Sequence, residues 1–292
     1  MGIQLVNNIV LETKRGEKMS VVNINNLIIN ANKRPVVDNV SFSVDEGEWL
    51  ALIGESGSGK SVTASSIGLL IHKNLNLVSG DINLNGIDIR SLNEEELRKI
   101  RGKEVAYIFQ DYQNAFTPFI KIGKQIEEMI KCHIDISNEE RKKRILNSLN
   151  DVGLDAKRVF NSYPFQLSGG QLQRAAIAQA VILKPKLLIA DEPTTALDAL
   201  TASKVLELLL DIKEKTKCAL LFITHDLRCA KNYANKIAIM HNGKIVEMGS
   251  RDKIVNNPEH IYTKNLFASI PPMRHVPKRL YITDEYKQSS FI

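Results

Sequence analysis

The sequence predicts an α/β fold in which a mostly parallel sheet is covered by helices, with a small antiparallel sheet beside it. A glycine-rich loop at residues 54–61 lies between a strand-like run and a helix-like run. Strand-like and helix-like runs alternate between residues 186 and 240, which is typical of a parallel sheet. Asn85-Gly86 and Asn242-Gly243 each lie between strand-like runs and predict two tight hairpins.

The first part of the chain supplies most of the predicted antiparallel sheet. Strands are expected at residues 21–30 and 36–44, followed by the strand 50–53 that enters the glycine-rich loop. A helix is expected at residues 62–71, and a hairpin follows from Gly80 through Asn85-Gly86. Residues 1–20 are interpreted as an extension, and translation could begin at Met1 or at Met19.

The middle of the chain is predicted to be largely helical. A charged helix at residues 91–101 and a buried strand at 105–109 precede helices at 123–132 and 137–150 and one that begins at Gln171. The basic run from Arg141 to Arg144 is interpreted as a solvated helix face and not as a binding patch.

The last part returns to alternating elements. Strands are expected at residues 186–190, 218–224 and 237–240, with helices at 201–215 and 227–235 between them. The hairpin at Asn242-Gly243 leads to a strand at 244–248, and residues 271–292 form a tail that is basic at first and polar later.

Bulk composition limits the possible functions only weakly. The chain has 292 residues, 43% of them hydrophobic and 25% charged, which is usual for a globular protein. A net charge of +6 fits a nucleic acid or anionic membrane partner, but scattered lysines without a local role explain it equally well. No apolar run has the 18 or so residues of a membrane span, and residues 1–20 contain no signal-peptide core. Cys132, Cys218 and Cys229 lack metal-type spacing and are expected to be reduced, mostly buried thiols.

The loop from Gly54 to Ser61 has the spacing G-x-x-x-x-G-K-S of a phosphate-binding loop. Glycines allow the backbone to wrap closely around a polyphosphate and turn N–H groups toward it. The helix that follows adds its positive dipole end. Lys60 is expected to reach the β- and γ-phosphates, and the Ser61 hydroxyl is expected to bind Mg²⁺.

Two further stretches carry chemistry. The apolar run from Leu187 to Ala190 ends in Asp191 and Glu192, at the strand end where ligands of open α/β sheets lie. Asp191 is suited to hold Mg²⁺, and Glu192 to act as the general base on an attacking water. Ser168 is expected to cap a helix preceded by two glycines, which forms a second anion-seeking helix start.

In combination, these motifs resemble the ATP-binding subunits of ABC transporters. Residues 54–61 match the Walker A motif, 167–171 the family signature and 187–191 Walker B, with Glu192 as the catalytic glutamate. Gln110 matches the Q-loop, Ala196-Leu197-Asp198 the D-loop, and His225 the switch histidine. The resemblance spans about residues 21–270, in family order.

The resemblance implies a RecA-like P-loop NTPase core, a small antiparallel β-subdomain and a helical subdomain inserted at about residues 111–180. It also implies a head-to-tail dimer that holds ATP and Mg²⁺ between the Walker motifs of one subunit and the signature of the other. The implied catalytic residues are Glu192, His225 and Gln110, and the implied metal-binding residues are Ser61, Gln110 and Asp191. The implied nucleotide-binding residues are Gly54, Ser56, Gly57, Gly59, Lys60, Ser61, Val62, Ser168, Gly169, Gly170 and Gln171.

Within the family, the chain is similar to the oligopeptide, dipeptide and nickel importers. The similar stretches are Phe109 to Asp111, Thr117-Pro118, Ile122 to Gln125, Asp191 to Asp198 and Pro258 to Thr263. This implies work at the cytoplasmic face of the cell membrane with permease subunits, a second ATPase subunit and, indirectly, an extracytoplasmic solute-binding protein. A different ATPase chain is favoured over an identical one. The alternatives are an exporter subunit and a soluble ABC ATPase that acts on nucleic acid or ribosomes, although no nucleic acid partner is expected.

Two features depart from the family pattern. The aromatic residue that usually stacks on adenine would fall near Ala31, where the sequence has no aromatic residue. Comparable affinities for ATP and GTP are therefore expected. No cysteine follows Cys229, so the iron–sulfur cluster of many peptide-importer relatives is not expected.

Overall fold

The computed structural model describes residues 20–195 and 197–269. The expectations for residues 1–19, including the choice between Met1 and Met19, lie outside the described residues, as do those for Ala196 and the tail.

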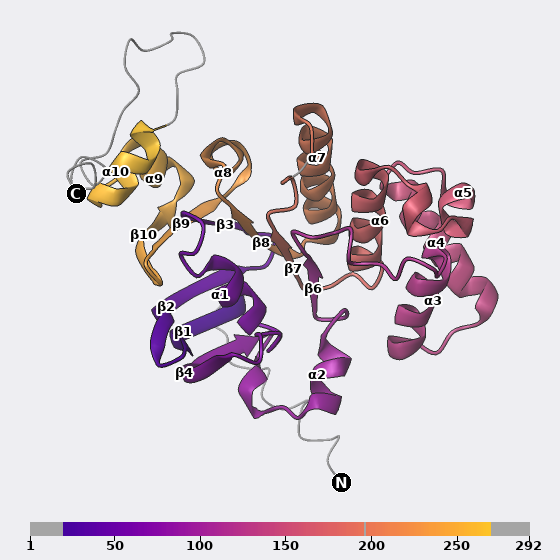
Figure 1. Cartoon of the computed structure of the whole chain (residues 1–292), viewed down its shortest axis with the longest axis horizontal. Helices are drawn as coiled ribbons and strands as arrows, with labels where there is room; N and C mark the ends of the chain where they lie inside the picture. The colour runs from indigo at the N-terminus through magenta and orange to yellow at the C-terminus, as the bar shows by residue number, and fades with distance from the viewer. Residues whose placement is uncertain (1–19, 196, 270–292) are drawn as a thin grey trace, which may run out of the picture.

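A six-stranded sheet runs through the centre of the fold (Figure 1). Its strand order is β10-β9-β3-β8-β7-β6, and all neighbours are parallel except β9 and β10. The strands are β3 (Trp49–Ile53), β6 (Val105–Ile108), β7 (Leu187–Asp191), β8 (Ala219–Thr224), β9 (Lys236–His241) and β10 (Lys244–Ser250). The predicted α/β fold class is confirmed.

The register of this sheet aligns the carboxyl ends of its central strands. Ile53 at the end of β3 pairs with Thr224 at the end of β8. The neighbouring ends of β7 and β6 are in step with them, because Asp191 pairs with Ile223 and Ile108 with Ala190. The segments that follow β3, β6, β7 and β8 therefore emerge at one edge of the sheet, where ligands of open α/β sheets bind.

The second sheet is antiparallel, with the order β2-β1-β4-β5. It contains β1 (Ser20–Ala31), β2 (Arg34–Asp45), β4 (Leu75–Leu84) and β5 (Ile87–Asp88). Both predicted Asn-Gly turns are present, with positive φ at Asn85 and Gly86 and at Asn242 and Gly243. β4 begins earlier than the sequence predicted, because its first half pairs with the end of β1.

The helices between β6 and β7 form a group beside the central sheet (Figure 1). They are α3 (Ile122–His133), α4 (Asn138–Asp151), α5 (Ala156–Asn161) and α6 (Gly169–Val181), with a 3₁₀ turn η2 (Pro164–Gln166) before α6. The sequence did not predict α5, which is short and capped by Asp155. Arg141 contradicts the predicted solvated face, because it is buried against α3 while Lys142, Lys143 and Arg144 are exposed.

The remaining helices are α1 (Lys60–Ser66), α2 (Glu94–Ile100) with the preceding turn η1 (Ile89–Ser91), α7 (Ala199–Thr216), α8 (Leu227–Tyr233), α9 (Arg251–Asn256) and α10 (Ile261–Ala268). The sequence did not predict α9 and α10. α1 ends earlier than predicted, because Leu69 takes a positive φ and Arg101 donates hydrogen bonds to the carbonyls of Gly68 and Leu69. Of the three cysteines predicted to be mostly buried, Cys218 is buried, Cys229 is half-buried and Cys132 is exposed.

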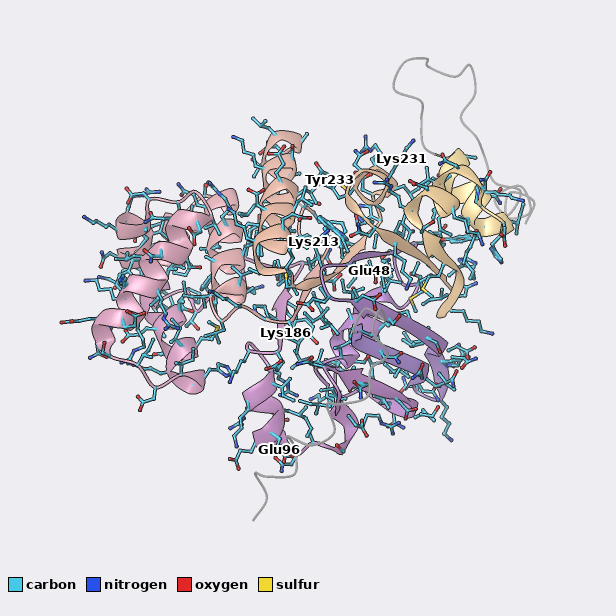
Figure 2. All side chains as sticks on the ribbon, turned by 180° about the vertical axis from the view of Figure 1, so that it is seen from behind. Glu48, Glu96, Lys186, Lys213, Lys231 and Tyr233 are labelled. Carbon is cyan, nitrogen blue, oxygen red and sulfur yellow. The ribbon has the colours of Figure 1, made fainter. Side chains whose placement is uncertain are left out.

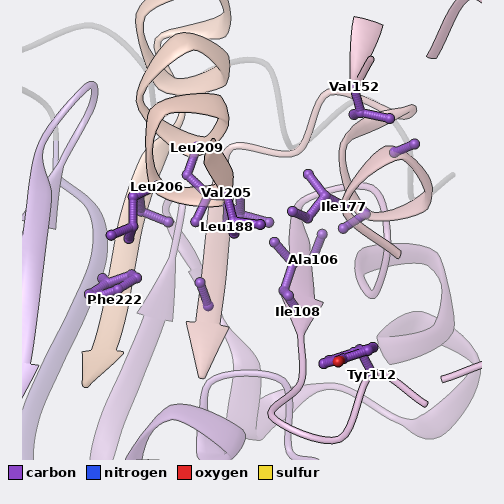
Figure 3. Close-up of a cluster of buried hydrophobic side chains, with 14 of the residues drawn as sticks. Ala106, Ile108, Tyr112, Val152, Ile177, Leu188, Val205, Leu206, Leu209 and Phe222 are labelled. Atoms are coloured by element: carbon purple, nitrogen blue, oxygen red, sulfur yellow. The ribbon is translucent and has the colours of Figure 1, made fainter. Parts of the chain in front are cut away.

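Two hydrophobic clusters cover the two faces of the six-stranded sheet. One joins the sheet to the helices, and Figure 3 shows Leu188 and Phe222 facing Val205, Leu206 and Leu209 of α7. The other joins the opposite sheet face to α1 and the antiparallel sheet. Strands β3 and β8 are buried throughout, which explains their continuous apolar sequences.

The start of β3 is fixed by buried polar and aromatic contacts. The ring of Trp49, the one tryptophan of the sequence, stacks on Tyr233 at 5.8 Å. Its backbone N–H donates to Asn235 Oδ1 at 2.9 Å, and buried Lys213 donates to the same oxygen at 3.2 Å. Figure 2 labels Lys213 on α7 and Tyr233 on α8. These contacts anchor the strand that leads into the glycine-rich loop.

Candidate functional site

The glycine-rich loop between β3 and α1 is tightly enclosed. A Cβ atom on Gly54 would lie 2.1 Å from the carbonyl oxygen of Met240, and one on Gly59 would lie 2.6 Å from that of Val36. Gly57 and Gly59 also have positive φ values of 81° and 102°. At Gly54 and Gly59 a side chain would displace neighbouring backbone, and at Gly57 the positive φ favours glycine, so the loop has the shape that close approach to a phosphate chain requires.

Lys60 begins α1 and points back into the loop. Its Nζ atom donates hydrogen bonds to the carbonyl oxygens of Gly54, at 2.9 Å, and Glu55, at 2.7 Å. Burial lowers the pKa of Lys60, although the charges of Glu192, Asp191 and Glu55 act in the opposite direction. The lysine is thus a desolvated cation with only neutral acceptors in direct contact, which favours an incoming anion.

Asp191 lies at the end of β7 beside the loop. Its carboxylate accepts a hydrogen bond from Ser61, and its Oδ1 atom is buried without a hydrogen-bond partner among the described residues. Burial raises the pKa of Asp191; Ser61 and Lys60 counteract this, and the charge of Glu192 adds to it. An unpaired buried carboxylate oxygen next to a hydroxyl is the hard oxygen donor set that Mg²⁺ prefers, so these residues fit the ion.

Glu192 directly follows Asp191 at the end of β7. Its side chain points toward His225, which follows the end of β8. Its Oε1 atom lies 3.3 Å from His225 Nδ1, and its Oε2 atom accepts a hydrogen bond from Thr195 Oγ1 at 3.1 Å. The Glu192 side chain is 15% exposed, whereas that of His225 is 62% exposed. The glutamate is therefore held in place, while the histidine has open space beside it.

One cavity of about 570 Å³ collects most of the predicted residues. Those that line it are Ser56, Gly57, Gly59, Lys60, Ser61, Val62, Gln110, Glu192 and His225. Gly54 and Asp191 adjoin it through their hydrogen bonds to Lys60 and Ser61. The described part of the lining contains no Phe, Tyr or Trp.

The signature residues lie elsewhere. Ser168 caps α6 by accepting a hydrogen bond from the Gln171 N–H at 3.3 Å, and the Gln171 side chain accepts one from the Ser168 N–H at 3.1 Å. A Cβ on Gly169 would lie 3.0 Å from the Tyr112 hydroxyl, and one on Gly170 would lie 2.9 Å from a Thr201 methyl. Side chains at residues 169 and 170 would collide with Tyr112 and Thr201, whereas the two glycines leave the backbone at the start of α6 accessible.

Ser168, Gly169 and Gly170 line a second cavity, of about 410 Å³, together with Asp198 and Arg174. Its described lining shares no residue with that of the phosphate-loop cavity. Asp198 caps α7, accepting hydrogen bonds from the Thr201 N–H and Oγ1, which lower the pKa of its carboxyl. Within one chain, the phosphate loop and the signature residues therefore line two separate cavities.

Sequence reasoning missed several residues in and around these cavities. Val36 and Glu55 line the phosphate-loop cavity, but neither residue type signals a ligand. Thr195 and Tyr112 contact Glu192 and the signature glycine, respectively. Among these residues, only Thr195 could have been predicted from the sequence, because the hydroxyl of a threonine three residues after a carboxylate can donate a hydrogen bond to it across a turn. In the part of the chain that the structure describes, no helix combines the length and apolar character needed to cross a bilayer.

Comparisons with known proteins agree with this geometry. A family model described as "ABC transporter" matches residues 37–195. The chain is 45% identical to the metal-staphylopine import system ATP-binding protein CntD of Staphylococcus aureus (strain NCTC 8325 / PS 47), over 81% of this chain and 87% of that protein. It is also 45% identical to the oligopeptide transport ATP-binding protein OppD of Bacillus subtilis (strain 168), over 81% of this chain and 67% of OppD.

The fold is similar to solved structures as well. It matches the dimeric structure of a post-hydrolysis state of the ATP-binding cassette MJ0796 bound to ADP and Pi with a TM-score of 0.69. The two chains are 31% identical, and the match covers 79% of this chain and 98% of the other.

Proposed function

The chain belongs to the ABC transporter family as the ATPase subunit of an importer, and from this premise we propose how its residues bind and cleave ATP and which partners it serves. The observation that carries the proposal is the register of the central sheet, which brings Lys60, Asp191, Glu192, His225 and Gln110 to one strand-end edge. The proposed domain limits are residues 21–270, with the helical insertion at about 111–180.

The phosphate loop binds the triphosphate of ATP. The enclosed glycines let its backbone approach the phosphates, and Val62 follows Ser61 on the helix that begins there. Lys60 exchanges its two carbonyl contacts for the β- and γ-phosphates, which replaces neutral acceptors by charged ones.

Ser61, Asp191 and Gln110 would hold Mg²⁺. The Oδ1 atom of Asp191 has no hydrogen-bond partner among the described residues and is free to act as an oxygen ligand, and Ser61 and Gln110 line the same cavity. When bound, the ion supplies neutralisation of charge on the phosphate oxygens. The three side chains come from α1, β7 and the segment after β6, so their relative placement depends on the sheet register.

Glu192 accepts the proton of the attacking water. Thr195 and His225 contact its two carboxylate oxygens and orient it toward the cavity. The exposed side of His225 contacts the γ-phosphate, and Gln110 orients the water from the segment that follows β6. The three catalytic residues thus surround the terminal phosphate from three different strands.

A second ATPase chain completes each site. Ser168, Gly169, Gly170 and Gln171 form the cap and first turn of α6, and the first three line a cavity apart from the phosphate loop of the same chain. They would hold the phosphates of a nucleotide bound to the loop of the partner. The similar MJ0796 cassette has a dimeric structure, which supports this arrangement, and the partner proposed for this chain is a different ATPase chain.

Permease subunits are the proposed membrane partners, at the cytoplasmic face of the cell membrane. Phe109, directly before Gln110, is 47% exposed, and Phe119 further along this segment is 83% exposed. Apolar side chains exposed beside a catalytic residue favour a docking surface for another protein. The cargo is proposed to be peptides or metal chelates, since OppD is an oligopeptide transport protein and CntD a metal-staphylopine import protein. An extracytoplasmic binding protein would deliver it.

The test compares Glu192→Gln and Lys60→Ala with exposed controls, Glu128→Gln and Lys142→Ala. Glu192→Gln is expected to bind ATP while losing nearly all turnover, because only the proton acceptor is removed. Lys60→Ala is expected to lose ATP binding. Both controls should match the wild type in equilibrium ATP binding and phosphate release. Wild-type turnover by Glu192→Gln would contradict the assignment of the base.

A further inference from the structure

Gln173 is a polar side chain in the interior of the protein that no role described so far explains. It lies in the second turn of α6, with 0% of its surface exposed. Its Nε2 atom donates a hydrogen bond to the carbonyl oxygen of Pro193 at 2.9 Å. Its Oε1 atom is buried without a hydrogen-bond partner among the described residues, so the bond to Pro193 is what pairs this amide in the interior.

Pro193 directly follows Glu192, whose backbone is unusual. Glu192 has a φ of 45°, in the left-handed region that residues other than glycine rarely adopt. Such a conformation persists only where several contacts impose it. Here the Glu192 N–H donates to the Ile223 carbonyl at 2.9 Å, the Thr195 N–H donates to the Glu192 carbonyl at 3.1 Å, and Gln173 holds the next carbonyl.

The same helix begins at the cavity that the signature residues line. Ser168 caps α6, and Gln173 follows within the same continuous helix, which extends from Gly169 to Val181. A helix of this length moves as a rod, because each turn is fixed to the next by backbone hydrogen bonds. A displacement or rotation of the Ser168 end is therefore passed to the amide of Gln173 and from there to the loop of Glu192.

We propose that Gln173 is a positioning residue that couples the two half-sites of one chain. When the start of α6 binds the nucleotide held by the partner subunit, Gln173 fixes the Pro193 carbonyl and with it the left-handed backbone of Glu192. The proton acceptor of one site then reaches its working orientation only if the signature half-site of the same chain is engaged. This inference rests on the proposed function, in which Glu192 is the base and the signature serves the partner's nucleotide.

A purely structural role makes a different prediction, and Ser148 supplies the matched control. Ser148 is also buried and also donates one hydrogen bond to a backbone carbonyl, from its Oγ to Ala178 of α6 at 3.0 Å. That contact joins α6 to α4, away from the Glu192 loop. Gln173→Met keeps the length of the side chain and removes its donor, and Ser148→Ala removes the hydrogen bond between α4 and α6.

The experiment measures kcat and KM for ATP, equilibrium ATP binding and the thermal unfolding midpoint in full-length chains, assembled with the paired ATPase subunit. Both variants should unfold at a lower temperature than the wild type. Gln173→Met is expected to reduce kcat about tenfold, the effect of about one lost hydrogen bond, with KM and ATP affinity within about twofold of wild type. Ser148→Ala should keep kcat within about twofold.

Three outcomes would overturn the proposal: an unchanged kcat in Gln173→Met, a loss of ATP affinity that accounts for its slower turnover, or equal losses of kcat in the two variants. Should Gln173→Met not fold, Gln173→Leu and Gln173→Glu replace it under the same criteria. Glu192→Gln is measured in parallel. If that variant retains turnover, the proposed function fails; if it loses turnover while Gln173→Met keeps the wild-type kcat, only the coupling fails.

Discussion

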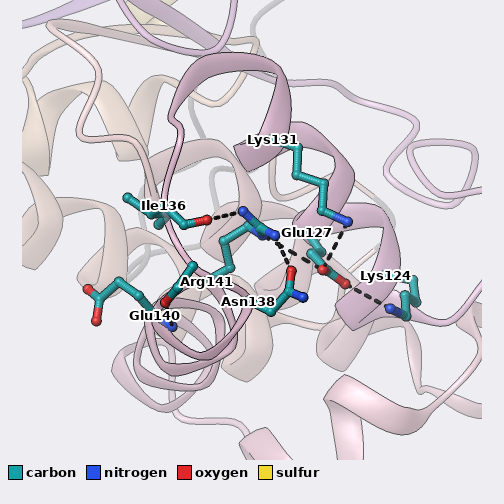
Figure 4. A network of polar contacts seen from close by, with 8 residues as sticks. Lys124, Glu127, Lys131, Ile136, Asn138, Glu140 and Arg141 are labelled. Carbon is teal, nitrogen blue, oxygen red and sulfur yellow. Dashed lines mark hydrogen bonds and ion pairs between the residues drawn. The ribbon is translucent and has the colours of Figure 1, made fainter.

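The ionic cluster between α3 and α4 allows an asymmetric stability effect to be predicted (Figure 4). Arg141 Nε lies 3.7 Å from Glu127 Oε1, and the two side chains are only 10% and 12% exposed. Arg141 also donates hydrogen bonds to the Ile136 carbonyl and to Asn138 Oδ1. Glu127 has two more cationic partners, Lys124 at 2.9 Å and Lys131 at 3.1 Å.

The two partners therefore differ in what their removal leaves behind. Arg141→Met keeps the apolar stem and leaves Glu127 paired with two lysines, so the unfolding free energy should fall by only about 1 kcal/mol. Glu127→Gln leaves a buried guanidinium without a carboxylate, which costs about 3–5 kcal/mol where burial is complete. Because Arg141 keeps two neutral acceptors, we expect a loss of about 2–3 kcal/mol.

The pH dependence has a defined sign. The hydrogen bond from Lys124 is the main cause that holds the pKa of Glu127 below its ordinary value; burial opposes it, and Lys131 supports it. A carboxyl with a lowered pKa in the folded state stabilises the protein above the unfolded pKa and loses that contribution as the pH falls through the folded value. The difference between wild type and Glu127→Gln should thus shrink below a pH of about 4.3.

Urea denaturation followed by far-UV circular dichroism measures both effects, with the exposed neighbours Glu128→Gln and Lys143→Met as controls. The controls should change the unfolding free energy by less than about 0.5 kcal/mol. A loss in Arg141→Met that equals or exceeds the loss in Glu127→Gln would refute this reasoning. So would a Glu127→Gln deficit that stays constant from about pH 7 to about pH 3.5.

Three further predictions concern the nucleotide site. Thr195→Val removes a hydrogen bond to the Glu192 carboxylate and should lower kcat about tenfold, whereas Thr194→Val should not; equal rates in steady-state assays would contradict this. Equilibrium binding should give comparable affinities for ATP and GTP, and Ala31→Tyr should tighten binding by stacking on the base; a strong adenine preference in the wild type would count against this. Burial lowers the pKa of Lys60, so the lysine should lose its charge, and the protein its affinity for ATP, at a pH below the ordinary value of 10.5. Lys60→Arg should keep its charge and its ATP affinity over the same range; superimposable curves of ATP affinity against pH for the wild type and Lys60→Arg would disprove this.

Much of the fold follows from local patterns in the sequence. The continuous apolar sequences of β3 and β8 and the two Asn-Gly turns are signals that need no tertiary information. The short helices α5, α9 and α10 were missed because each has too few turns to show an apolar periodicity. The burial of Arg141 was missed because its partner Glu127 lies on another helix.

The candidate site was predictable where a motif imposes backbone geometry. The carbonyl groups of Met240 and Val36 lie so close to Gly54 and Gly59 that only glycine fits there. The spacing of the glycines, Lys60 and Ser61 was enough to predict the loop. The sequence could not reveal Gln173, since a glutamine on a helix is usually solvated and its acceptor, the Pro193 carbonyl, is set by packing. Contacts to backbone carbonyls leave no trace in the residue type of the acceptor.

The central claim is that one chain carries two incomplete half-sites, and the most direct test relates turnover to assembly. Mass photometry gives the fraction of paired chains at each protein concentration, and phosphate release gives the rate per chain in the same samples. We expect no turnover where the chain is monomeric and turnover in proportion to the paired fraction, whether the second ATPase chain is identical or different. Monomers that hydrolyse ATP at the full rate per chain would contradict the account.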